Sequence, residues 1–109
     1  MDVDLADRLR EVLQDEDGLS EKAMFGGIAF LVNGNMAVGA SGQGGLLLRV
    51  DPEQADDLLT RPHASLAVMR GREMRGWMRI DSDGIETMRE LREWARHGVV
   101  FARALPPKA

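Results

Sequence analysis

The sequence predicts an α+β domain of two layers, in which helices pack on one face of a five-stranded antiparallel sheet. Apolar residues recur at helical spacing near the start of the chain and again near its end. Between these segments the apolar period changes to two, which is typical of strands. An Asn33-Gly34 pair, the strongest two-residue hairpin signal, joins two of the predicted strands. The predicted order of elements is α-β(3)-α-β(2)-α.

Three segments are predicted to be helical. The first covers residues 4–15. The second begins at Asp51-Pro52, because aspartate caps a first turn and proline fits its first position. The third follows residues 82–84 and is expected to bend or break at His97-Gly98. The apolar stripe of the first helix is Leu5, Leu9, Val12 and Leu13, and that of the third is Ile85, Met88, Leu91, Ala95, Val99 and Ala102.

The five predicted strands cover residues 22–32, 35–41, 46–50, 65–70 and 75–81. Short turns connect consecutive strands, and strands connected in this way usually pair antiparallel. Helices on one side then bury one face of the sheet. The other face of such a sheet is often in contact with water.

Length and composition predict one globular domain, residues 1–109. The chain is 44% apolar and 29% charged, which is ordinary for a globular protein. It contains no cysteine, which excludes disulfides and thiolate metal sites. No apolar stretch approaches the roughly 20 residues of a membrane-spanning helix, and the N-terminus does not resemble a signal peptide. We therefore expect a cytoplasmic protein without a membrane partner.

Charge is unevenly distributed along the chain. Residues 1–21 contain eight acids and two arginines, whereas residues 61–80 contain five arginines and one glutamate. Such polarity can steer an acidic partner, although both segments could equally be solvated faces. The formal net charge of −4 argues against general binding of DNA without regard to sequence.

Two glycine-rich segments could be mistaken for phosphate-binding loops. Residues 24–27 (Met-Phe-Gly-Gly) lack the Gly-Lys-Ser/Thr of a P-loop, and no helix follows them. A bulge, a bend or the close approach of another backbone explains these glycines better. Residues 42–45 receive the same interpretation, as a turn.

The residue types of common active sites are present but not arranged as a site. His63 and His97 have no metal-ligand spacing, and His97 is expected near the C-terminal end of a helix, whose dipole favours a cation. Ser41 does not lie in a nucleophile elbow that His63 and Asp51 would complete. The nearby carboxylates Asp81 and Asp83 fit a turn and a helix cap. We therefore expect no enzymatic activity, no metal and no cofactor.

The most unusual segment is residues 70–80. Period-two alternation places Arg75, Trp77 and Arg79 on one face of a strand, with Arg49 of the third strand able to join them. Arginine and tryptophan are enriched at binding hot spots, and they also suit single-stranded nucleic acid. Local packing of the tryptophan under arginine stems is the alternative. The predicted interaction surface is Arg49, Arg72, Arg75, Trp77 and Arg79.

Five short segments, in the same order along the chain, resemble the TfoX N-terminal domain family. They are residues 22–37 (Lys-Ala-Met-Phe-Gly-Gly-Ile-Ala-Phe-Leu-Val-Asn-Gly-Asn-Met-Ala), 47–50, 61–63, 74–77 and 101–108. The family is similar to the N-terminal half of bacterial TfoX/Sxy competence regulators. The resemblance implies a two-layer α+β fold related to secretion-chaperone-like folds, a tendency to dimerise and a regulatory role, with no catalytic residues. The full-length regulators have a second, helical domain, so competence itself is not implied by this segment alone.

The sequence therefore favours a non-enzymatic regulatory module that binds a protein partner or a second copy of itself. A nucleic-acid-associated regulator that uses the basic 70–79 segment is one alternative. A domain that binds a small molecule between the sheet and the helices is another.

Overall fold

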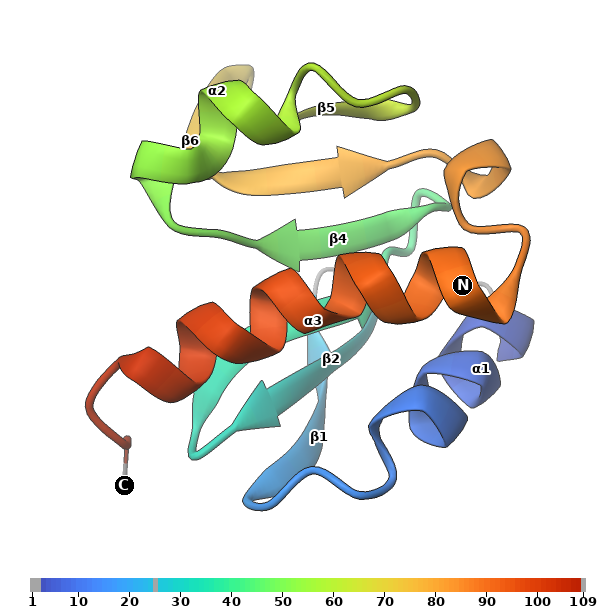
Figure 1. Ribbon diagram of the computed structural model, residues 1–109, viewed down its shortest axis with the longest axis vertical. Helices are drawn as coiled ribbons and strands as arrows, with labels where there is room; N and C mark the ends of the chain where they lie inside the picture. Colours follow the sequence, from blue (N-terminus) through green and yellow to red (C-terminus); the bar gives the residue numbers. More distant parts are fainter. Residues whose placement is uncertain (1–2, 25, 109) are drawn as a thin grey trace.

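The structure, a computed structural model, describes residues 3–24 and 26–108 (Figure 1). The class is α+β, as predicted, with helices and one antiparallel sheet. The sheet has six strands rather than five, so the predicted count was wrong by one. None of the helices in these residues is both long and apolar enough to cross a bilayer.

The additional strand comes from the first predicted strand, which is in fact a hairpin. β1 (Leu19–Met24) runs antiparallel to β2 (Gly27–Val32), and Met24 lies opposite Gly27. Gly26 turns the chain with φ +72°, a left-handed conformation that glycine adopts without strain. Because the alternation of apolar residues continues through this turn, the sequence pattern does not reveal the turn. Phe25, part of the predicted segment, lies outside the described residues.

The hairpin predicted at Asn33-Gly34 is confirmed. Both residues have positive φ, 52° and 83°, as a type I′ turn requires. The turn joins β2 to β3 (Asn35–Ala40), and β4 (Leu46–Arg49) follows. The pairing of β2 with β3 shifts between Phe30 and Leu31, which is a bulge in the ladder.

The last two strands pair with each other before they complete the sheet. β5 (Ala64–Met69) and β6 (Arg72–Ile80) form a hairpin, and β6 inserts beside β4. The order of strands is β1-β2-β3-β4-β6-β5, and every neighbouring pair is antiparallel. β1 and β5 are therefore the two outer strands.

The helices are α1 (Val3–Leu13), the short α2 (Ala55–Leu58) and α3 (Met88–Ala104). Asp51 and Pro52 open a 3-10 turn before α2, and the Asp51 side chain accepts a hydrogen bond from the backbone N–H of Glu53 at 2.9 Å, as predicted. Thr87 and Glu90 form a reciprocal capping box at the start of α3.

The bend expected at His97-Gly98 is wrong, because α3 runs without interruption to Ala104. Position 98 requires glycine for a reason other than a bend. A Cβ at this position would lie 2.2 Å from the carbonyl oxygen of Ala37 in β3. The glycine therefore allows close approach of α3 to the sheet.

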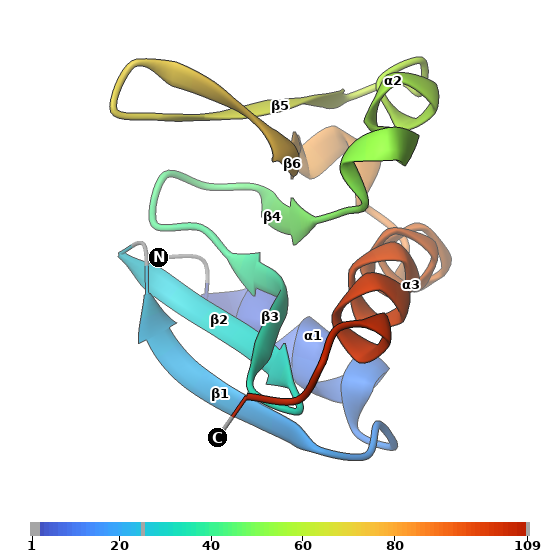
Figure 2. The same ribbon diagram turned by 90° about the vertical axis from the view of Figure 1, so that its left-hand side faces the viewer.

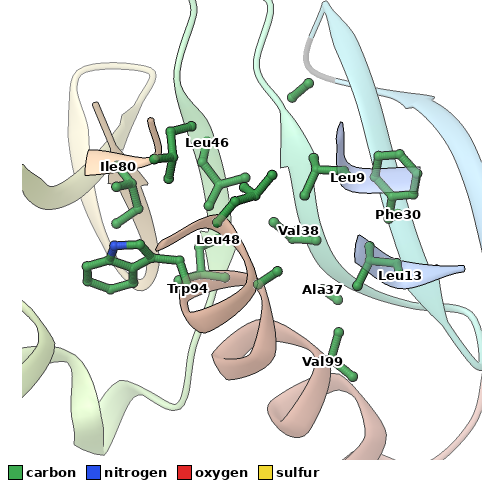
Figure 3. Packing of buried hydrophobic residues seen from close by; sticks show 14 of the residues in the cluster. Leu9, Leu13, Phe30, Ala37, Val38, Leu46, Leu48, Ile80, Trp94 and Val99 are labelled. Atoms are coloured by element: carbon green, nitrogen blue, oxygen red, sulfur yellow. The ribbon is translucent and has the colours of Figure 1, made fainter. Parts of the chain in front are cut away.

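All three helices lie on the same side of the sheet (Figure 2). The main core lies between α1, α3 and the inner face of the sheet, where Phe30, Val38 and Leu48 are fully buried (Figure 3). At the C-terminal end, Asn35 donates hydrogen bonds to the carbonyl oxygens of Ala102 and Pro106, at 3.3 and 3.0 Å. The segment after α3 is thereby attached to the start of β3.

Candidate interaction surface

The face of the sheet that turns away from the helices carries a second apolar cluster. Ala29, Met36, Leu47 and Ala67 are buried there, and Met24, Leu31, Met69 and Trp77 pack against them half-buried. These residues come from all six strands. We call them the open-face cluster. The part of the outer face formed by the four buried residues is therefore not in contact with water.

The apolar pattern of β2 and β4 in the sequence indicates this cluster. β2 and β4 carry apolar residues at both alternating positions, for example Leu46 and Leu48 on one face and Leu47 on the other. A strand that is apolar on both faces is expected where both faces are covered. Here the structure supplies helices for one face only.

Arg49 and Trp77 lie together at one end of the open-face cluster, as predicted. They are directly opposite in the pairing of β4 with β6. The guanidinium carbon of Arg49 lies 5.5 Å from the ring centroid of Trp77 and 5.5 Å from that of Phe101 in α3. Both distances are within the range of cation–π attraction, so the arginine interacts with two rings.

Arg79 lies on the same face as Trp77 but is engaged by the protein's own loop. Its guanidinium donates to the side-chain oxygen of Gln43 at 3.2 Å, to the carbonyl of Gln43 at 2.8 Å and to the carbonyl of Gly44 at 2.7 Å. These bonds hold the connection between β3 and β4, in which Gly44 and Gly45 have positive φ. The predicted turn at residues 42–45 is thus present, and Arg79 fixes it.

Arg75 and Arg72 lie away from the Arg49–Trp77 pair. Arg75 pairs with Asp56 of α2 at 3.2 Å, with both side chains largely exposed. An exposed pair of this kind adds little stability. Arg72 is exposed at the start of β6, opposite Met69. The structure therefore brings two of the five predicted residues into contact, gives Arg79 a loop-holding position beside them and separates the other two.

The acidic N-terminal segment is partly neutralised by arginines. Arg10 donates to both carboxylate oxygens of Glu21, at 2.8 and 2.9 Å, and to Asp7 at 2.7 Å. The hydrogen bonds from Arg10 lower the pKa of Glu21. Arg103 of α3 pairs with Glu16 at 2.7 Å. These pairs thus tie α1 to β1, and the connection between α1 and β1 to α3.

Ser41, Asp51 and the backbone of His63 each take part in a hydrogen bond. The Ser41 hydroxyl accepts the backbone N–H of Gln43 at 3.1 Å, and Asp51 caps the turn before α2. The carbonyl of His63 accepts the backbone N–H of Asp81 at 3.0 Å. The described residues contain no group of three or more histidines or carboxylates placed to hold a metal ion.

His97 is within α3 rather than at its end, so the predicted helix-dipole environment is wrong. The ring lies half-buried, 6.1 Å from that of Trp94. Burial, assisted by the nearby charge of Arg61 and opposed by that of Glu93, lowers the pKa of His97 from its ordinary value of 6.5.

We expect the lowered pKa of His97 to make the fold less stable in mild acid. Below about pH 6.5 the unfolded chain binds a proton at this position more readily than the folded chain, so the free energy of unfolding falls with pH. Urea midpoints at pH 7.5 and 5.5 measure the loss, which should be smaller in His97→Gln. An equal loss in both proteins would show that His97 is not its source.

The arrangement defines a class of protein: a small α+β domain whose sheet is covered by helices on one face and presents an apolar cluster beside an Arg–Trp pair on the other. The comparison with protein families gives the family. The TfoX N-terminal domain model matches residues 11–102, so the chain belongs to the TfoX N-terminal domain family, a family of regulatory domains. No curated protein and no solved structure gives a significant match.

Proposed function

We propose that this protein is a non-enzymatic regulatory module that acts by binding another protein through the open face of its sheet. The observation that carries the proposal is the open-face cluster, which no helix covers in the part of the chain that the structure describes. Its half-buried members, Met24, Leu31, Met69 and Trp77, leave part of the cluster accessible, and accessible apolar surface flanked by polar residues is characteristic of interaction sites. Membership of a regulatory family is consistent with this role.

The Arg49–Trp77 pair gives the surface a specific anchor. Tryptophan and arginine are enriched at hot spots, and here the arginine already lies within cation–π distance of two rings before any partner binds. Because a preorganised anchor loses less conformational entropy on binding, it contributes more to affinity. Protein binding therefore has more support than nucleic-acid binding, since Arg79 and Arg75 already interact with the protein itself.

Replacement of Trp77 with alanine should remove the partner while leaving the fold intact. Loss of a hot-spot residue typically weakens binding by about 2 kcal/mol or more, about 30-fold. The measurement is quantitative affinity purification from the native host with wild-type protein, Trp77→Ala and a control, Arg89→Ala, in which the substituted residue is an exposed member of α3 on the other side of the sheet.

Three results would count against the proposal. The set of captured proteins could be identical for wild-type protein and Trp77→Ala, or Arg89→Ala could lose as much of the captured partner as Trp77→Ala. Alternatively, nucleic acid could bind with an affinity that falls steeply with salt, which would favour the nucleic-acid role instead. Light scattering on the purified protein tests the expected homodimer separately.

A further inference from the structure

β5 is an outer strand without the charges or proline that often protect the edge of a sheet, and its pairing with β6 shifts between Leu66 and Ala67. Its six residues, Ala-Ser-Leu-Ala-Val-Met, include no charge, no proline and no glycine. Natural edge strands usually carry charges or proline, because unpaired backbone N–H and C=O groups attract other strands. The opposite edge, β1, contains Glu21 and Lys22, and Glu21 is paired with Arg10.

One face of β5 is continuous with the open-face cluster, because Ala67 and Met69 belong to that cluster. Val68 between them lies on the opposite face, paired with Glu73 of β6, and is 62% exposed. A cavity of about 320 Å³ lies beside residues 67–70, bounded also by Ser41, Leu47 and Arg79. A strand added along β5 would therefore extend the sheet and place side chains beside this cavity.

The charges near β5 disfavour a second copy of the same strand. Arg70 follows β5 directly, whereas Arg61, which precedes it, lies over the Trp94 ring of α3 at 5.3 Å from its centroid. In a parallel pair, Arg70 would lie near its own copy, and in an antiparallel pair centred on the strand it would lie near residues 61–63 of the other chain. Like charges placed opposite each other across strands are destabilising. An acidic strand would meet the arginines favourably.

We propose that β5 binds an extended segment of a partner protein by strand addition, a segment that is apolar in its middle and acidic at the end that meets Arg70 and Arg72. The inference rests on the proposed interaction role and specifies how the partner is bound. Backbone hydrogen bonds along β5 supply affinity, while the cavity and the arginines supply selectivity. Arg70 and Arg72, both exposed at the turn between β5 and β6, are the cations nearest the outer end of the strand.

Two synthetic peptides of eight residues test the charge requirement. Both alternate valine and threonine in the centre; one has two glutamates at each end and the other has two lysines. Titration into ¹⁵N-labelled full-length protein should show that the glutamate peptide shifts the amide resonances of residues 64–70. It should also slow hydrogen exchange of β5 amides, which binding through side chains alone would not do. The lysine peptide should bind at least about 10-fold more weakly.

Val68→Lys and Val100→Lys form a matched pair of variants, because these valines are exposed to 62% and 59% in β5 and α3. Strand addition predicts that Val68→Lys weakens binding of the glutamate peptide about 10-fold, whereas Val100→Lys leaves it unchanged. Simple charge attraction predicts the opposite for Val68→Lys, since an added cation would strengthen binding of an acidic peptide.

Several outcomes would overturn strand addition at β5. They are equal binding of the two peptides, no slowing of exchange in β5, or stronger binding after Val68→Lys. If Trp77→Ala abolishes binding and Val68→Lys does not, the peptide occupies the open face; strand addition is then wrong while the proposed function stands. A concentration-dependent dimer with slowed β5 exchange would identify a second copy as the occupant.

Discussion

Replacement of Gly98 with alanine should destabilise the protein by about 2 kcal/mol, within the range of roughly 1–3 kcal/mol known for overpacked cores. The added Cβ would lie 2.2 Å from the carbonyl oxygen of Ala37 and 2.8 Å from a methyl group of Leu48. Since backbone cannot rotate away as a side chain does, α3 would have to move off the sheet. Urea denaturation measures the loss.

The expected loss of stability is opposite in sign to the usual effect of this substitution in a helix. In a helix that does not contact a neighbour closely, glycine to alanine stabilises by about 1 kcal/mol. Gly76→Ala in β6 is the matched control, because its nearest neighbours would be 3.5 and 3.6 Å away, at ordinary contact distance. An increase in stability for Gly98→Ala would contradict the close seating of α3 on β3 and β4.

Phe30→Ala should have the largest effect on stability, a loss of about 3–5 kcal/mol. Phe30 is fully buried on the inner face of β2, close to Leu9 and Leu13 of α1 (Figure 3). Removal of the ring leaves a cavity between the helix and the sheet. Such a loss is a large part of the total stability of a small domain, so thermal unfolding should begin far below that of the wild type.

Leu31→Ala, at the next residue along β2, tests whether the two faces of the sheet contribute differently to stability and to binding. Leu31 is half-buried in the open-face cluster, so its truncation should cost less than that of Phe30. It should instead weaken partner binding, which calorimetry or the affinity purification described above can measure. Equal stability losses for the two variants would show that the outer cluster is as much a core as the inner one.

The fold class and most elements followed from local chemistry. The Asn33-Gly34 turn and the Asp51-Pro52 helix start depend on the conformations of two or three residues, and the structure has both. The turn at Gly26 was missed because period-two alternation continues through a tight hairpin whose two strands happen to match in phase. Alternation identifies strands but not where one ends and its neighbour begins.

The prediction of the interaction surface lacked several tertiary contacts, because no local sequence pattern encodes them. Alternation correctly placed Trp77 and Arg79 on one face and opposite β4. It could not show that loop carbonyls would engage Arg79 or that Asp56 of α2 would reach Arg75. It also could not show Phe101 beside Arg49, because α3 packs across strands distant in sequence. These are tertiary contacts, and only the assembled sheet creates them.

The insertion of β6 between β4 and β5 has a consequence for how the chain assembles. β1 to β4 form from neighbouring segments, and β5 with β6 is a local hairpin, whereas the pairing of Leu46 with Ile80 closes a long loop. Long-range closures are slow steps in folding. During synthesis, one edge of β4 therefore stays unpaired until residues 77–80 have been made. The docking of the β5–β6 hairpin onto β4 is therefore the step most exposed to mispairing. α3, which packs on β3 and β4, is synthesised after that hairpin and can pack on the sheet only later.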